Sequence, residues 1–519
     1  MAKKKTQPKL NVALIAIGRQ ENRYAREWVE YHLTLGVEHI YILDNNREGE
    51  EHFEAVLSEF IDSGKVTIEN YRDKPLAMLK AYTEAYNRHK DHHDWLGLID
   101  FDEFLDIRKG NINTFLSDRK SNCVLVNWEC YGDNGRKKYT DAPVQERFPE
   151  PLPHPLYVQY TDHAENEHVK SFVRGGLADV KFTATPHVPT GCETYELANG
   201  LTAACDSYAA SPFQEFNDSV AVLKHYITKT AEEWVEKIRR GGVDIPYAQW
   251  HAAYVSRFFK YNEHTAAKEK ILAQLFEKVV AIVHYNTPEL TEATILSLRK
   301  HGGENYKVVI FDNSDERPFK KRMKGVRIID NTKGKYVDFD AELAKFPDRD
   351  ASIGVAGKCV HGSTKHQLSV QKLWELLPGG FLLMDPDILL KQSVDFMFQF
   401  DQCAVGHVQE AYKGGNPMGI NRLVPMLCFI NVPACINGGA KYFDPTRTWG
   451  LLPGGRKNRN NWYDTGAPLL EDIHSHKNGL RGIRIDIRPL MEHLQSGSWR
   501  NSDRKLQDEW LKKHADLWK

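Results

Sequence analysis

The chain has 519 residues, with 69 basic and 70 acidic side chains and a formal net charge of −1. This length exceeds what one hydrophobic core usually accommodates, so two or three domains are expected. The lack of a basic surplus argues against a nucleic-acid-binding protein.

The cysteines and the two chain ends bear on the cellular compartment. The eight cysteines form no CxxC pair and no metal-finger spacing, which favours free thiols in a reducing cytosol. No apolar run approaches the roughly 18–20 residues that cross a bilayer. The N-terminal stretch MAKKKTQPKL is basic but lacks the apolar core of a signal peptide, so we expect a cytoplasmic protein. The C-terminal stretch DEWLKKHADLWK predicts either a terminal helix docked on the protein or an interfacial helix in peripheral contact with the inner membrane face.

The first half of the chain alternates predicted strands with predicted helices. Short apolar runs predict the strands, and apolar side chains at three- and four-residue spacing predict the helices. The predicted strands are 11–18, 39–46 and 66–70, and the predicted helices are 21–35, 53–61 and 76–90. The stretch WLGLIDFDEFL (95–105) follows as a buried strand that ends in acids. This alternation indicates parallel β-α-β units and an α/β fold.

The second half repeats the same order. The predicted strands are 279–286, 306–315 and 326–331, and the predicted helices are 288–300 and 361–377. The stretch FLLMDPDILL (381–390) repeats the buried strand with acids at its end, and the second strand of each half ends in aspartate, as ILDNN and VIFDNS. We therefore expect a duplicated architecture with two Rossmann-like, mainly parallel sheets in tandem.

The expected organisation has five parts. Predicted helices at 230–240 and 250–276 separate the two halves. The parts are a basic disordered tail (1–10), a first domain (11–228), a helical connector (229–276), a second domain (277–500) and a C-terminal helix (501–519).

Each half carries an acid pair at the end of its buried strand: Asp100 and Asp102 in the first half, Asp385 and Asp387 in the second. Ligands of parallel α/β sheets collect beyond the carboxyl ends of the strands. Two carboxylates there can reach a hard cation such as Mg²⁺ or Mn²⁺ and the ribose of a nucleotide. Solvated acids at a strand end are the alternative, and the repeat of the pattern favours a site.

Longer motifs carry a resemblance to known enzymes. In the first half they are IGRQENRYAREWVEYHLTLGVEHIYILDN, LIDFDEFL, VNWECYGDNG, VQERF, HVKSFVR and LKHYITKTAEEWVEKIRRG. This half resembles the family-92/family-2-like glycosyltransferases of the GT-A fold over most of residues 11–245. The second half carries VHYNTPELTEATILSL, VIFDNS, LLMDPDILL, WYDTGAPLLEDI and HLQSGSW, and it resembles a family-2 GT-A domain over residues 278–500.

The resemblance implies roles for particular residues. The last acid of each pair and a late histidine would hold one Mn²⁺ or Mg²⁺ per domain; these are Asp102 with His225 and Asp387 with His493. The remaining implied residues would bind the nucleotide sugar; they are Asp44, Asp100, Asp312, Asp385, Glu21, Asn286 and Lys365.

Family-2-like enzymes invert the anomeric centre, which requires one general base near the acceptor hydroxyl. In the second half Asp464 is the first choice because it precedes Thr-Gly, and Asp472 is the second. In the first half Glu146 is the choice, although a solvent-facing or ion-paired Glu146 is equally compatible with the sequence.

The resulting expectation is a bifunctional, metal-dependent, inverting hexosyltransferase. It would transfer sugars from nucleotide-diphosphate donors, with UDP-galactose as the guess for the first domain, to a glycan or lipid-linked acceptor in surface or capsular polysaccharide synthesis. The alternative is a single activity, with the other domain serving as a glycan-binding or positioning module.

Overall fold

The computed structural model describes most of the chain. The described residues are 9–47, 49–75, 77–155, 165–203, 216, 218–241, 251–302, 305–346, 358–377, 379–410, 421–447, 465–475, 480–494 and 504–519. The chain divides into two compact units. The first unit comprises residues 1–245 and 252–272, and the second comprises residues 246–251 and 273–519. Most of the predicted tail at 1–10 lies outside the described residues.

The first unit is built on one sheet. Its strands are β1 (Val12–Gly18), β2 (His39–Asp44), β3 (Val66–Asn70), β4 (Trp95–Leu98), β5 (Glu103–Ile107), β6 (Cys123–Cys130), β7 (Val169–Arg174), β8 (Tyr195–Leu197) and β9 (Ala221–His225). The order is β3-β2-β1-β4-β7-β6-β9-β5, with β8 paired to β6. The first four strands in this order are parallel, and β7 joins β4 antiparallel.

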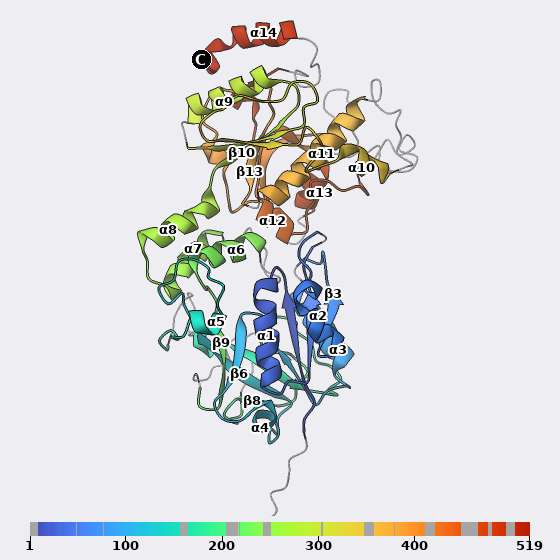
Figure 1. The fold of residues 1–519 in the computed structure, drawn as a ribbon, viewed down its shortest axis with the longest axis vertical. Coiled ribbons are helices and arrows are strands. Elements are labelled where there is room, and N and C mark those ends of the chain that lie inside the picture. Colours follow the sequence, from blue (N-terminus) through green and yellow to red (C-terminus); the bar gives the residue numbers. More distant parts are fainter. Residues whose placement is uncertain are drawn as a thin grey trace, which may run out of the picture. The chain divides into compact units, whose positions relative to one another are not determined.

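The helices of the first unit follow the predicted alternation (Figure 1). They are α1 (Asn22–Thr34), α2 (Glu54–Asp62), α3 (Met78–His89), α4 (Ile112–Leu116), α5 (Val144–Arg147), α6 (Ala231–Arg240), α7 (His251–Tyr261) and α8 (Ala266–Leu272). Residues 229–276, predicted as a connector, contribute α6, most of α7 and α8 to the first unit. Here α6 contacts α8.

Both faces of the first sheet are covered. Alternate residues of a strand point to opposite faces, and in β1 the side chains of Val12 and Leu14 join one apolar cluster while those of Ala13 and Ile15 join another. All four are fully buried. Burial on both faces explains why β1 is a continuous apolar run rather than an alternating one.

The second unit repeats the central strand order. Its strands are β10 (Val279–His284), β11 (Lys307–Asp312), β12 (Val326–Asp330), β13 (Phe381–Met384), β14 (Ile388–Leu390), β15 (Ala404–Gln409), β16 (Arg422–Ile430), β17 (Gly482–Arg484) and β18 (Met491–His493). The sheet order is β12-β11-β10-β13-β16-β15-β17, and β14 pairs with β18 separately. Four parallel strands are again followed by an antiparallel one. The predicted α/β class, with a largely parallel sheet in each half of the chain, is therefore confirmed.

The helices of the second unit include a docked C-terminal helix. They are α9 (Pro288–Gly302), α10 (Phe339–Ala344), α11 (Lys358–Leu376), α12 (Val432–Asn437), α13 (Ala467–His474) and α14 (Arg504–Lys513). Figure 1 shows α14 beside α9, and Leu511 joins an apolar cluster with Leu290 and Ala293 of α9. The structure thus gives the C-terminal stretch a docked helix. Among the described residues, no helix is long and apolar enough to span a membrane.

Candidate functional site

A braced turn follows the first strand of the first unit. Gln20 lies just beyond β1 with φ of +53°, a conformation that is uncommon for residues other than glycine. Its backbone N–H donates to Asn46 Oδ1 at 2.7 Å, and the N–H of Asn46 donates to Asp44 Oδ1 at 2.9 Å. Asp44 also pairs with Arg72 at 2.7 Å. The brace fixes the loops at the carboxyl ends of β1 and β2.

The second unit has the same brace. Asn286 lies just beyond β10 with φ of +56°. Its N–H donates to Ser314 Oγ at 2.9 Å, and the N–H of Ser314 donates to Asp312 Oδ1 at 3.0 Å. Asp312 Oδ2 also accepts from the N–H of Phe319 at 2.7 Å. Asp44 and Asp312 therefore both have partners within the protein, and their contact with a nucleotide stays a prediction.

Each acid pair lies in the turn between two strands, and these two strands pair with different partner strands. In the first unit the chain leaves β4, passes Asp100 and Asp102, and enters β5, which pairs antiparallel with β9. The register places Glu103 opposite His225. In the second unit β14 pairs with β18, and Ile388 lies opposite His493. In each unit the residue that follows the second aspartate of the pair, Glu103 or Ile388, thus lies opposite the predicted histidine on the partner strand.

This register brings each histidine to its acid. His225 Nε2 lies 3.8 Å from Asp102 Oδ2, and His493 Nε2 lies 3.5 Å from Asp387 Oδ1. Asp102 and Asp387 are both buried. The histidines come from more than one hundred residues further along the chain, so the two strand pairings create these contacts.

Three candidate ligands converge in the second unit. One ligand atom from each of Asp385, Asp387 and His493 lies within 4.8 Å of the others. Burial and the nearby charge of Asp387 raise the pKa of Asp385 to about 7. Burial alone would lower the pKa of His493, but the carboxylates of Asp387 and Asp385 raise it. Protons are thus held at a site that contains a concentrated negative charge.

Lysine ammonium groups contact the acids of the first unit. Asp100 pairs with Lys170 of β7 at 2.7 Å and accepts from Tyr82 Oη at 2.7 Å. Asp102 pairs with Lys237 of α6 at 2.7 Å. Burial alone would raise the pKa of Asp102, but Lys237 and His225 hold it well below its ordinary value. Burial lowers the pKa of His225, which favours the neutral imidazole.

The third acid of the first unit, Glu103, lies beneath the pair. It is fully buried, and its Oε2 accepts from the N–H of Asp100 at 2.8 Å. Burial, with the charges of Asp100 and Asp102, raises the pKa of Glu103 to about 8. Glu103 therefore holds the turn that carries Asp100 and is itself favoured in the protonated form.

The donor atoms of both units fit a hard divalent cation, but to different extents. Carboxylate oxygens suit Mg²⁺ and Mn²⁺, and an imidazole nitrogen suits the transition metals. The second unit offers Asp385, Asp387 and His493 together. In the first unit Asp102 and His225 offer one oxygen and one nitrogen, and a lysine contacts each acid of the pair. The second set is the more complete one.

The predicted bases have varied surroundings. Asp464 lies outside the described residues. Asp472 is buried on α13, where both of its carboxylate oxygens accept from Arg447 at 3.1 Å. Glu146 is exposed on α5. These surroundings do not connect Glu146 or Asp472 with an acid pair, so both roles stay predictions.

Two further residues that were predicted to bind the nucleotide sugar, Glu21 and Lys365, already contact other side chains. Glu21 is buried and pairs with Arg240 of α6. Lys365 is exposed on α11, with its ammonium 5.4 Å from the ring centre of Phe339.

Sequence reasoning missed the basic residues that α6 brings to the first site. Lys237 contacts Asp102, and Arg240 donates to the carbonyl oxygens of Arg19 and Gln20 at 2.9 Å each. The signal was present in KTAEEWVEKIRR, because Lys237 and Arg240 are three residues apart and lie on one helix face.

Most of the first unit matches the model of a known protein family. The model of the family described as Glycosyltransferase family 92 matches residues 17–240. This range contains the first acid pair, His225 and α6.

Sequence relatives align over a short stretch. A glycosyltransferase family 92 protein of Oryza sativa subsp. japonica is 33% identical over 88 residues, which are 17% of this chain and 15% of that protein. A family 92 protein of Ricinus communis is 30% identical over 92 residues, 18% of this chain and 16% of that protein. The chain therefore aligns with only a small part of the length of these relatives.

The chain also shows a weak similarity to a solved structure. The structure of S. aureus TarS residues 1–349 matches with 10% identity and a TM-score of 0.23, covering 51% of this chain and 70% of that one.

Proposed function

We propose that the chain is a glycosyltransferase that uses nucleotide-diphosphate sugars, with a donor site in each unit. The observation that carries the proposal is the shared strand register that places His225 at Asp102 and His493 at Asp387. The family 92 match over residues 17–240 supports a glycosyltransferase in the first unit. The repeated strand order and braced turns support a related site in the second.

In the proposed reaction an acceptor hydroxyl displaces the nucleotide diphosphate from the anomeric carbon with inversion. A bound Mn²⁺ or Mg²⁺ would neutralise the leaving diphosphate as a Lewis acid. Asp102 and His225 would hold it in the first unit, and Asp385, Asp387 and His493 in the second. Asp100 would orient the sugar or ribose of the first donor.

A general base must take the proton of the acceptor hydroxyl. We propose Asp464, with Asp472 as the second choice, for the second unit and Glu146 for the first. Glu146 suits this role in one respect, because it is exposed and can meet an acceptor from solvent. The acceptor is proposed to be a glycan or a lipid-linked sugar, and UDP-galactose is the first donor to test.

The test is release of nucleoside diphosphate, with and without acceptor glycans, across a panel of nucleotide sugars in the presence of Mn²⁺. Asp102→Asn and Asp387→Asn are assayed separately and together. Two activities that each disappear with one substitution support the proposal. If no donor is bound or turned over by the unsubstituted chain, the proposal is wrong.

A second candidate function retains one catalytic unit and uses the other for binding or positioning glycans. The lysines at the acids of the first unit favour it, because they already neutralise carboxylates that would otherwise attract a cation. This candidate predicts that Asp387→Asn abolishes all turnover, whereas Asp102→Asn leaves turnover intact and changes only acceptor binding.

A further inference from the structure

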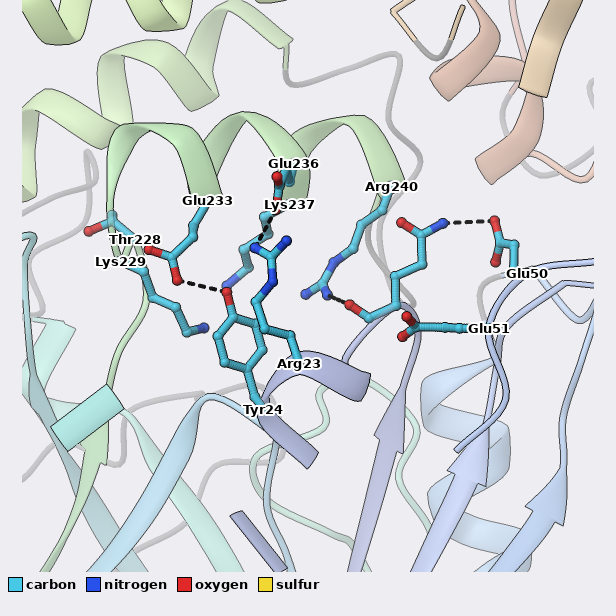
Figure 2. Close-up of a pocket in the computed structure, with 11 residues that line it drawn as sticks. Arg23, Tyr24, Glu50, Glu51, Thr228, Lys229, Glu233, Glu236, Lys237 and Arg240 are labelled. Carbon is cyan, nitrogen blue, oxygen red and sulfur yellow. Dashed lines mark hydrogen bonds and ion pairs between the residues drawn. The ribbon is translucent and has the colours of Figure 1, made fainter. Parts of the chain in front are cut away.

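A pocket of about 370 Å³ in the first unit lies against α6. Its lining includes residues from the turn after β1, the loop after β2, α1 and the segment from Thr228 to Arg240. Figure 2 shows the side chains of Lys229 and Lys237 extending from this last segment toward Tyr24, while Arg240 donates to the carbonyl oxygen of Gln20. The pocket therefore presents cationic groups beside the end of β1.

Lys229 is the unusual member of the lining. Its side chain is only 5% exposed, and its ammonium lies 4.5 Å from the ring centre of Tyr24. Within the described parts of the chain, no carboxylate or carbonyl accepts a hydrogen bond from it. A buried ammonium without such a partner costs free energy, which a bound anion would offset.

The backbone at Lys229 is a second, independent observation. Its φ is +50°, in the left-handed region that residues other than glycine seldom adopt. Thr230, which follows, caps α6 together with Glu233, so the strained residue is held at the start of the helix. Strain of this kind collects where function fixes the position of a side chain.

Three of the four carboxylates of the pocket pair with arginines, and the fourth, Glu51, accepts the backbone N–H of Asn22 at 2.8 Å. Glu233 accepts from Arg147 at 2.9 Å and from Tyr24 Oη at 2.7 Å. Glu236 pairs with Arg23 at 2.7 Å. Glu50 in turn pairs with Arg19 at 3.2 Å. The other cations of the lining are paired, Arg23 with Glu236, Lys237 with Asp102 and Arg240 with Glu21, so Lys229 is the one for which the described residues show no ion pair.

Lys237 connects the pocket to the acid pair. It lines the pocket, and its Nζ contacts Asp102 Oδ2 at 2.7 Å. A diphosphate carries negative charge on two phosphoryl groups and can therefore contact both Lys229 and Lys237. We propose that Lys229, together with Lys237, binds the diphosphate of the donor in the first unit, an inference that rests on the proposed function.

The test uses the full-length chain carrying Asp387→Asn, which disables the second site. Calorimetric titrations with UDP, UMP, uridine and inorganic pyrophosphate compare Lys229→Met, Lys229→Arg and the exposed control Lys80→Met. Loss of one charge-assisted contact should weaken UDP and pyrophosphate binding by about tenfold or more. Uridine binding should stay unchanged, and Lys229→Arg should retain most of the affinity for UDP.

Thermal unfolding distinguishes a ligand site from a structural role. Removing a buried ammonium that lacks a partner should leave the melting temperature of Lys229→Met unchanged or raise it. A lower melting temperature with unchanged affinity for UDP and pyrophosphate overturns the inference. Equal affinity for UDP and pyrophosphate overturns the assignment to a nucleotide donor.

The inference and the proposed function can fail separately. If UDP binding depends on Lys229 but no sugar is transferred from any donor, the diphosphate site is supported and the proposed function fails. If sugar is transferred and Lys229→Met binds UDP normally, the inference fails and the function is unaffected.

Discussion

The two units share a strand order but differ in the charged side chains that contact their acid pairs. Each has the strand order 3-2-1-4, a braced turn after its first strand, and a strand pairing that brings a late histidine to the last acid of a pair. In the first unit, however, Asp100 and Asp102 contact Lys170 and Lys237. In the second unit His366 Nε2 lies 3.9 Å from Asp385 Oδ1. Burial raises the pKa of Asp385, and the cations that lower it are His493 and the guanidinium of Arg422.

The difference arises from the side chains that two elements place around the acids. Lys170 comes from β7, the antiparallel strand that corresponds to β16 of the second unit, and Lys237 comes from α6. We propose that the shared strand order fixes where a cation would bind, and that neighbouring side chains set how strongly the carboxylates would attract it. Each of the following predictions tests this separation.

The largest expected effect is loss of metal binding in the second unit. Asp387→Asn removes one ligand from a set of three, and we expect Mn²⁺ affinity at that site to fall by roughly 10²-fold or more, since a neutral amide replaces a charged ligand. Titration of Mn²⁺ followed by electron paramagnetic resonance measures it. The matched control Asp102→Asn should leave this site intact. Equal losses in both variants would contradict independent sites.

The next effect concerns Lys237. Without nucleotide, Lys237→Met removes a cation that competes for Asp102, so Mn²⁺ affinity in the first unit should rise by about tenfold. The same titration in an Asp387→Asn background isolates this site. Lys224→Met, which removes a lysine that pairs with Asp106 on the adjoining strands, is the control. A decrease would show that Lys237 supports the metal site instead of competing with it.

The third effect is a difference in pH dependence. Asp385, with a pKa of about 7, and His493, whose pKa is raised, must lose protons to bind a metal. Because up to two protons must leave, Mn²⁺ affinity of the second unit should fall by about tenfold to a hundredfold for each pH unit below 7. The first unit should change little between pH 6 and 7, because the pKa values of Asp102 and His225 are both lowered and Glu103, with a pKa of about 8, stays protonated there. Measurements in Asp102→Asn and Asp387→Asn separate the sites, and parallel profiles would contradict the assignment.

The smallest effect concerns the braces, which the two units share. Asn46→Ala removes the acceptor for the N–H of Gln20, and Ser314→Ala removes the acceptor for the N–H of Asn286. Each should lower local stability by about 1 kcal/mol. Hydrogen exchange of peptides that cover each turn should accelerate only in the unit that carries the substitution. Unchanged exchange in either variant would show that its turn does not depend on this bond.

Much of the frame could be predicted from sequence because local signals agreed with it. The predicted strand at 66–70 has the same bounds as β3, and the predicted helix at 21–35 is longer than α1 by one residue at each end. Apolar runs identify parallel strands that are buried on both faces. The repeat of ILDNN and VIFDNS also indicated that the second strands end alike, which the paired braces explain.

The chemistry of the sites was less accessible to prediction. A histidine far along the chain could be matched to its acid only through motif resemblance, since a strand pairing across such a separation leaves no local pattern. The spacing of Lys237 and Arg240 indicates a basic helix face, but no spacing along the sequence indicates that Lys170 and Lys237 contact the two acids. The positive φ of Lys229 likewise could not be predicted, because the residue at that position is not a glycine.

The pairing of β5 with β9, and of β14 with β18, also sets an order in time. A ribosome delivers the acids of each unit long before the strand that carries its histidine. Until residue 225 or residue 493 has been synthesised, the corresponding centre lacks a ligand and the strand that would position its last acid. Each proposed centre is therefore completed only when the last strand of its own unit has been synthesised.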